Sequence, residues 1–261
     1  MTDQTYYNDG YESTISQSHA WRTAKNSSGY MLKYIKPTDK ILDVGCGPGT
    51  ITYDLSNYVP EGEIIGIEPT KELIDEALNN EKSDAVQNVK FQVASVFELP
   101  FPDNHFDIVH AHQVIIHLQH PVEALKEMRR VLRPDGYLCF KDAELRSTIY
   151  YPRKYEDQLG YYMTKIRTEF TSCFGASRSK ELTLEAGFDP ENIVFTTSNW
   201  TISSENDRRW FSQMYINRLE SLEFGKSDKY TREQLELAWK EWASDDNAVC
   251  ILLHGEIVAK K

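Results

Sequence analysis

The chain has 261 residues, of which 40% are hydrophobic and 26% are charged, and its formal net charge is −11 at pH 7. This composition excludes a disordered chain, and the acidic balance argues against a nucleic acid as the main partner, because phosphate binding needs a basic face. A chain of this length can bury a substantial core, and we predict a single elaborated domain over residues 1–261.

The cysteines and the apolar segments indicate the compartment. The four cysteines lie far apart, without the paired spacing of a zinc site or the density of a disulfide scaffold, so we expect reduced thiols. The N-terminus has no basic region followed by an apolar run, and no later segment is long and uncharged enough to span a bilayer. We therefore predict a cytoplasmic protein without stable membrane insertion, and the sequence leaves its oligomeric state open.

Short β-rich runs alternate with helical patterns over residues 38–143, which indicates a parallel sheet covered by helices. The expected strands are Lys40–Val44, Glu63–Glu68, Val89–Ser95, Phe106–Ala111 and Tyr137–Ala143. A helix over Ser179–Phe188 and two late strands, Ile193–Trp200 and Val249–Lys261, follow. We predict a Rossmann-like, doubly wound α/β fold with a seven-stranded sheet, mostly parallel with an antiparallel last strand.

Three closely spaced glycines follow the first strand in "ILDVGCGPGTIT": Gly45, Gly47 and Gly49. In an open α/β sheet, ligands bind at the carboxyl ends of the strands, and such a turn lets the backbone approach a ligand that a Cβ would exclude. Glu68, at the end of the second strand, can accept hydrogen bonds from both hydroxyls of a ribose. The arrangement favours a nucleoside-containing cofactor.

Two other ligands of glycine turns fit this segment less well. A dinucleotide fingerprint needs glycine or alanine where Thr50 stands, and a triphosphate loop needs a lysine followed by Ser or Thr. An NAD(P)-dependent oxidoreductase stays as an alternative, because it would share the strand, the turn and the ribose acid. A non-catalytic cofactor-binding module that mediates interactions is a third possibility.

Four segments resemble successive motifs of class I S-adenosylmethionine-dependent methyltransferases: "LDVGCGPGT", the acid of "GIEP", "ELPFPDNHFDIVHA" and "MRRVLRPDGYL". The resemblance covers residues 38–143 closely. The wording is similar to that of the small-molecule methyltransferases of ubiquinone and menaquinone biosynthesis, and "SHAWRTAKNSSGYML" resembles their lead-in helix. It implies an enzyme that moves a methyl group from S-adenosylmethionine to a small-molecule acceptor and releases S-adenosylhomocysteine.

The resemblance also implies which residues hold the cofactor. It puts Asp43, Gly45 and Gly47 around the amino-acid part and Glu68 on the ribose. Ser95, where the family commonly has aspartate, would flank the adenine. The remaining residues that we assign to the cofactor from the motifs are Cys46, Gly49, Thr50, Pro69, Val96 and Phe97 and, beside the sulfonium, Ala111, His112 and Gln113.

The N-terminal segment 1–37, which we predict to be a lead-in and cap, adds two cofactor candidates. Tyr11 can close over the cofactor. Arg22 can hold a carboxylate of the cofactor or the substrate, or it can pair with a neighbouring acid.

Two insertions at the ligand-bearing edge are rich in aromatic residues, and we predict that they form helical lids. The first covers residues 144–175. The second, residues 203–245, has apolar residues at helical spacing and a capping box formed by Thr231 and Gln234. Together they favour a small acceptor that is partly apolar or aromatic.

The segment "HAHQVIIHLQH" contains several histidines, but it supplies no cysteine or paired carboxylate to complete a metal site, so we predict no metal. Methyl transfer needs a general base only when the nucleophile remains protonated. His112, His117 and His19 are the candidate bases, with a structural role as the alternative for each.

Overall fold

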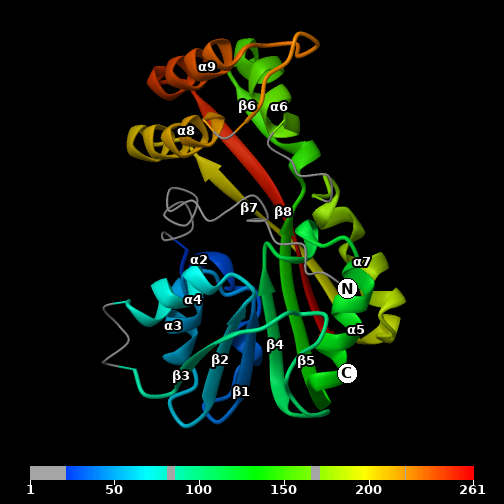
Figure 1. The fold of residues 1–261 in the computed structure, drawn as a ribbon. Coiled ribbons are helices and arrows are strands. Elements are labelled where there is room, and N and C mark those ends of the chain that lie inside the picture. The colour runs from blue at the N-terminus through cyan, green and yellow to red at the C-terminus, as the bar shows by residue number, and fades with distance from the viewer. Residues whose placement is uncertain (1–21, 81–85, 166–170, 221) are drawn as a thin grey trace.

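The computed structural model describes residues 22–80, 86–165, 171–220 and 222–261, and these form a sheet covered by helices (Figure 1). The eight strands have the order β3-β2-β1-β4-β5-β8-β6, and β7 pairs with β8. β1 to β5 are parallel, whereas β8 is antiparallel to each of its neighbours. The strands are β1 (Lys40–Val44), β2 (Glu63–Glu68), β3 (Val89–Val93), β4 (Phe106–His112), β5 (Leu132–Ala143), β6 (Ile149–Tyr151), β7 (Ile193–Ile202) and β8 (Val249–Lys260).

Helices cover both faces of the sheet. Ile41 of β1 belongs to an apolar cluster that includes residues of α2 and α3, and the next residue, Leu42, belongs to the cluster on the opposite face, which includes residues of α5 and α7, as the pleat of a strand requires. None of the helices in the described part of the chain is long and apolar enough to cross a membrane. The helices are α2 (Ala24–Ser27), α3 (Thr50–Ser56), α4 (Lys71–Leu78), α5 (Pro121–Val131), α6 (Glu156–Lys165), α7 (Gly175–Glu185), α8 (Glu205–Leu219) and α9 (Arg232–Ser244), with short 3-10 turns at Leu32–Tyr34, Ile115–His117, Leu145–Ser147, Arg153–Tyr155 and Pro190–Asn192.

The predicted fold class is confirmed, with eight strands rather than seven. The additional strand, β6, lies in the insertion that we expected to be helical, and its three residues pair with the start of β8. β5 begins at Leu132, earlier than predicted, because the turn at Asp135 (φ 66°) forms an irregularity within the strand and does not precede it. The capping box at Thr231 and Gln234 is confirmed at the start of α9.

β7 and β8 extend beyond the carboxyl end of the central sheet. β5 pairs with β8 only between His254 and Lys260, whereas β7 follows β8 from Cys250 to Ala259. The part of β8 that projects past β5 pairs with β6 instead. This projecting ribbon carries α6, α8 and α9 above the strand ends (Figure 1).

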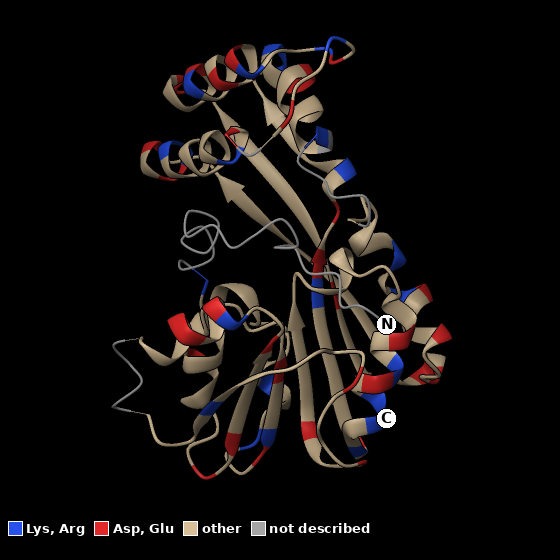
Figure 2. Ribbon diagram, in the orientation of Figure 1, with Lys and Arg blue, Asp and Glu red and all other residues tan. Residues whose placement is uncertain are grey.

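The projecting layer has a hydrophobic core of its own, centred on the fully buried Trp239 of α9. The Tyr215 ring of α8 stacks on Trp239 at 4.9 Å, and the Ser212 hydroxyl donates to the Trp239 carbonyl at 2.9 Å. Buried Arg208 donates through Nε to the Ala243 carbonyl at 3.2 Å, which satisfies the end of α9. α8 and α9 are therefore held together as a unit, and Figure 2 shows acidic and basic residues mixed along both.

Candidate active site

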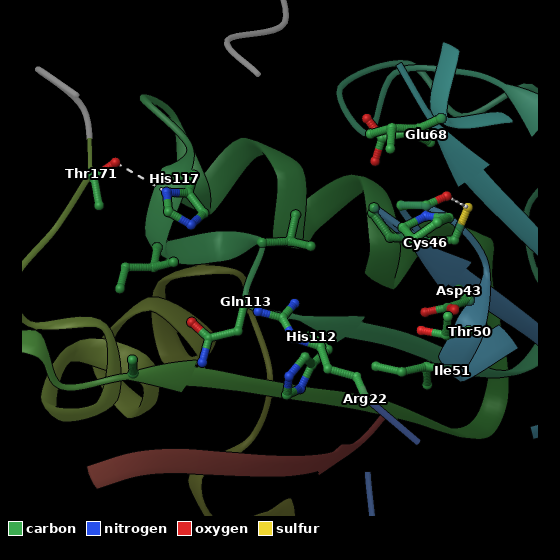
Figure 3. A pocket seen from close by; sticks show the side chains of 18 of the residues that line it. Arg22, Asp43, Cys46, Thr50, Ile51, Glu68, His112, Gln113, His117 and Thr171 are labelled. Carbon is green, nitrogen blue, oxygen red and sulfur yellow. Dashed lines mark hydrogen bonds between the residues drawn. The ribbon is translucent and has the colours of Figure 1, made fainter. Parts of the chain in front are cut away.

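One cavity lies between the carboxyl ends of β1, β2 and β4 and the projecting layer. Its floor comes from the glycine turn and the strand ends, and its opposite wall comes from α6, β7, α8 and β8. Figure 3 shows Asp43, Cys46 and Glu68 on one side and His117 and Thr171 on the other. The residues of the opposite wall are Leu145, Met163, Thr171, Trp200, Trp210, Phe211, Met214, Tyr215, Arg218 and Leu252.

The three glycines of the turn have different functions. A Cβ on Gly47 (φ 53°) would meet no atom within 4 Å, and Gly47 lines the cavity, so this glycine leaves room for a ligand. A Cβ on Gly49 would lie 2.6 Å from the Phe91 ring, and Gly49 is not part of the lining. A Cβ on Gly45 would collide with Val114 at 2.5 Å. Packing therefore excludes a side chain at Gly45 and at Gly49, whereas the space beside Gly47 is open to the cavity.

Two buried carboxylates border this part of the cavity. Glu68 is 7% exposed, and its Oε1 accepts a hydrogen bond from the Thr70 backbone N–H at 3.2 Å. Asp43 is 2% exposed and also lines the cavity. Burial and both carboxylates raise the pKa of the Cys46 thiol well above its usual value, so this thiol is neutral. A buried acid beside an open glycine turn fits the ribose of a nucleoside cofactor.

The predicted adenine residues divide into two groups. Val96 lines the cavity together with its neighbour Ala94, whereas Ser95 and Phe97 are not among the lining residues. The Ser95 hydroxyl instead accepts a hydrogen bond from the Phe97 backbone N–H at 3.2 Å. Of the other predicted contacts, Thr50 and Pro69 both line the cavity.

The end of β4 brings a polar pair into the cavity. His112 and Gln113 line it, whereas Ala111 is buried outside the lining. Gln113 adopts a left-handed conformation (φ 59°), and its backbone N–H donates to the Lys141 carbonyl at 2.8 Å. Neither ring nitrogen of His112 has a hydrogen-bond partner among the described residues. Burial holds the pKa of His112 well below its usual value, so the ring is neutral at pH 7.

The other predicted bases and cap residues lie in different places. His117 lines the cavity, and its Nδ1 is 3.0 Å from the Thr171 hydroxyl (Figure 3). Burial, followed by the charges of Arg218 and Arg22, lowers the pKa of His117 to about 3. Arg22 lines the cavity with its guanidinium 5.7 Å from the centre of the Trp200 ring. The remaining two predicted residues, His19 and Tyr11, lie outside the described residues.

The sequence predicted helical segments at this edge but assigned none of their residues individually to the cavity. Phe211, Met214 and Tyr215 of α8 line it. Trp200 was missed because the strand pattern does not show that β7 projects past the central sheet. This projection places Trp200 in the cavity lining. Trp210 was also missed, and its spacing of four residues from Met214 is the signal that could have identified it.

Comparisons with known proteins show the family to which the chain belongs. A protein family described as "Methyltransferase domain" matches residues 35–211. An uncharacterized methyltransferase of Schizosaccharomyces pombe is 44% identical over 272 residues, covering 100% of this chain and 98% of the relative. A demethylmenaquinone methyltransferase of Staphylococcus aureus is 39% identical over 112 residues, covering 42% of this chain and 46% of the relative.

A solved structure extends the likeness to most of the fold. The phosphoethanolamine N-methyltransferase 2 of Haemonchus contortus, in complex with S-adenosylhomocysteine, has a TM-score of 0.60 and 16% identity. The match covers 98% of this chain and 59% of that one.

The fold and the site define a Rossmann-like enzyme that binds a nucleoside-containing cofactor. The chain belongs to the methyltransferase-domain family, and it is an S-adenosylmethionine-dependent methyltransferase. The resemblance seen in the sequence is confirmed, and the nicotinamide alternative is set aside.

Proposed function

We propose that the enzyme methylates a small, partly apolar or aromatic molecule bound in this cavity. The observation that carries the proposal is the continuity of the cavity from Gly47 and Glu68 to the aromatic wall of Trp200, Trp210 and Tyr215. Concave, largely apolar sites with a few polar groups are typical of small-molecule binding. A cavity between the two cores also supports our proposal that the chain works as a single domain.

The residues around the glycine turn support one orientation of the cofactor. We assign the ribose hydroxyls to Glu68 and the amino-acid part to Asp43 and the Gly45–Gly47 turn. The adenine then lies beside Val96, and the reacting end of the cofactor is directed toward His112 and the aromatic wall. The open space at Gly47 and the buried carboxylate of Glu68 support this assignment.

The chain's own residues contribute mainly by positioning and by excluding water. The bound cofactor supplies an activated methyl group for in-line displacement. Holding an acceptor against it can account for about 7 to 11 kcal/mol of barrier lowering. The wall formed by Trp200, Trp210 and Tyr215 excludes water, and aromatic ring faces attract positive charge. Either of the neutral histidines, His112 or His117, can remove a proton from the nucleophilic atom of the acceptor if that atom is protonated when it binds.

A methylation assay tests the proposal. We would incubate the full chain with methyl-labelled S-adenosylmethionine and with separate panels of aromatic small molecules, protein substrates and RNA. We expect label in the small-molecule panel, and a Trp210→Ala variant with a raised acceptor KM and unchanged affinity for S-adenosylhomocysteine. Leu237→Ala, on the exposed side of α9, is the control. Label confined to protein or RNA would contradict a small-molecule acceptor.

A further inference from the structure

A chain of buried hydrogen bonds lies directly behind the cofactor side of the cavity. The Ser28 hydroxyl is 2.9 Å from Nε2 of His110, and Nδ1 of His110 is 2.7 Å from Oδ1 of Asp43. Ser28 and His110 are fully buried, and Asp43 is 2% exposed. The three residues come from the segment after α2, from β4 and from β1, so His110 links three separate parts of the chain.

The register of the sheet explains how the pair forms. Asp43 and His110 are direct partners in the parallel β1–β4 pair, and both side chains face the side covered by α2 and α3. From α3, the Thr52 hydroxyl donates to Oδ2 of Asp43 at 2.6 Å. Each oxygen of the carboxylate is therefore held by a different element, which fixes the plane of the group.

The hydrogen bond between His110 and the carboxylate has a defined direction. An ionised carboxylate has acceptors only, so Nδ1 of His110 carries the hydrogen and donates it to Asp43. At the other side of the ring, Nε2 lies within hydrogen-bond distance of the Ser28 hydroxyl, which can act as donor or acceptor. Hydrogen bonds arranged in series strengthen one another in a medium of low dielectric constant. The Asp43 carboxylate therefore holds the ring through Nδ1, and Ser28 holds the opposite ring nitrogen.

Of these four residues, only Asp43 lines the cavity. We propose that His110 is a positioning residue, which holds the Asp43 carboxylate so that it receives the ammonium group of the cofactor's amino-acid part. This inference rests on the cofactor orientation given under the proposed function. Because His110 does not reach the cavity, any effect that it has on the cofactor passes through Asp43.

Two ligands distinguish this function from simple packing. S-Adenosylhomocysteine carries the amino-acid part, whereas 5′-methylthioadenosine has the same nucleoside and thioether without it. By calorimetric titration, we expect His110→Leu to bind S-adenosylhomocysteine about tenfold more weakly, and 5′-methylthioadenosine within about twofold of wild type. His110→Asn should restore most of the affinity, because the Asn amide nitrogen can take the place of Nδ1.

Two outcomes would overturn the proposal. Either S-adenosylhomocysteine binds His110→Leu as tightly as wild type, or both ligands lose affinity equally. Should His110→Leu fail to fold, Ser28→Ala provides the same test, with an expected loss of about threefold confined to S-adenosylhomocysteine and equal losses contradicting it.

The affinities of the wild-type protein for the two ligands show whether a failed test concerns His110 or the cofactor orientation on which the proposal rests. If wild type does not bind S-adenosylhomocysteine more tightly than 5′-methylthioadenosine, the orientation itself is wrong. If wild type prefers S-adenosylhomocysteine and His110→Leu keeps that preference, only the function of His110 is wrong.

Discussion

The two sides of the cavity are built in different ways. On the cofactor side, short segments follow parallel strands, and residues 45–48 of the glycine turn, with positive φ at Gly45 and Gly47, line the cavity. On the acceptor side, bulky side chains arrive from α6, β7, α8 and β8, which span residues 156 to 260 of the chain. The first side depends on backbone geometry, and the second depends on a separate hydrophobic core.

This difference explains why one side leaves a motif in the sequence and the other does not. A left-handed turn that lines a cavity restricts the residue type, and both the positive φ of Gly47 and the open space beside it favour glycine. An apolar wall tolerates many combinations of large side chains. We therefore expect changes on the cofactor side to alter cofactor affinity, and changes on the acceptor side to alter acceptor binding and turnover.

The largest effect should come from the glycine turn. Gly47→Val places a branched side chain in cofactor space and should weaken S-adenosylhomocysteine binding by about 3 kcal/mol or more. Gly187→Val is the matched control, because Gly187 also has a positive φ (90°) and open space around its Cβ but lies at the end of α7, outside the cavity lining. We would measure both by calorimetric titration. Equal affinity losses in the two variants would mean that backbone strain, and not occupied space, is responsible.

Turnover should depend on His112 if the acceptor arrives protonated. His112→Asn should then lower kcat by about a hundredfold and leave the affinity for S-adenosylhomocysteine unchanged. Because burial holds the pKa of His112 well below its usual value, kcat should not fall as the pH decreases from 8 to about 6.5. Unchanged turnover in His112→Asn, and in His117→Asn, would show that positioning alone carries the reaction.

The two acids at opposite ends of β2 offer a matched pair. Glu68→Ala should weaken S-adenosylhomocysteine binding by about 2 kcal/mol, because charge-assisted hydrogen bonds to the ribose are lost. Glu63→Ala removes an ion pair with Lys90 at the far end of the strand and should leave the affinity unchanged. Calorimetric titration of both variants and of wild type with S-adenosylhomocysteine measures these affinities. An unaltered affinity in Glu68→Ala would show that Glu68 does not bind the ribose.

The smallest effect concerns stability at the boundary between the two sides. His254 is fully buried, its ring lies 4.4 Å from that of Trp200, and burial lowers its pKa to about 3. As the pH falls below about 6.5, the unfolded state takes up a proton that the folded state does not, so stability decreases, by about 1.4 kcal/mol at pH 5.5. Denaturant unfolding of His254→Phe should show a correspondingly weaker pH dependence. The same dependence in both proteins would contradict burial of a neutral ring.

Much of the cofactor side could be predicted from the sequence. β1 and β2 have the predicted bounds, because a buried strand followed by glycines, and an apolar strand ending in an acid, are local patterns. The separate functions of the glycines could not be predicted, since the Phe91 ring that excludes a side chain at Gly49 comes from β3. The pairing of Asp43 with His110 likewise depends on the β1–β4 register, and residue spacing does not determine which strands are neighbours.

The acceptor side was predicted only where its helices carry local signals. The capping box gave the start of α9, and the apolar spacing over residues 203–245 indicated helices without identifying individual wall residues. The projection of β7 and β8 past the sheet left no signal, because their residues continue an ordinary strand pattern. Both β6 and the position of Trp200 follow from that projection, so they could not be inferred.

A crystal structure of the complex with S-adenosylhomocysteine tests the central claim, that one cavity joins the cofactor turn to the aromatic wall. We predict that the ribose hydroxyls bind the Glu68 carboxylate and that the sulfur faces the space bordered by Trp200, Trp210 and Tyr215. A nucleoside bound away from Glu68, or a sulfur directed away from this wall, would contradict the account.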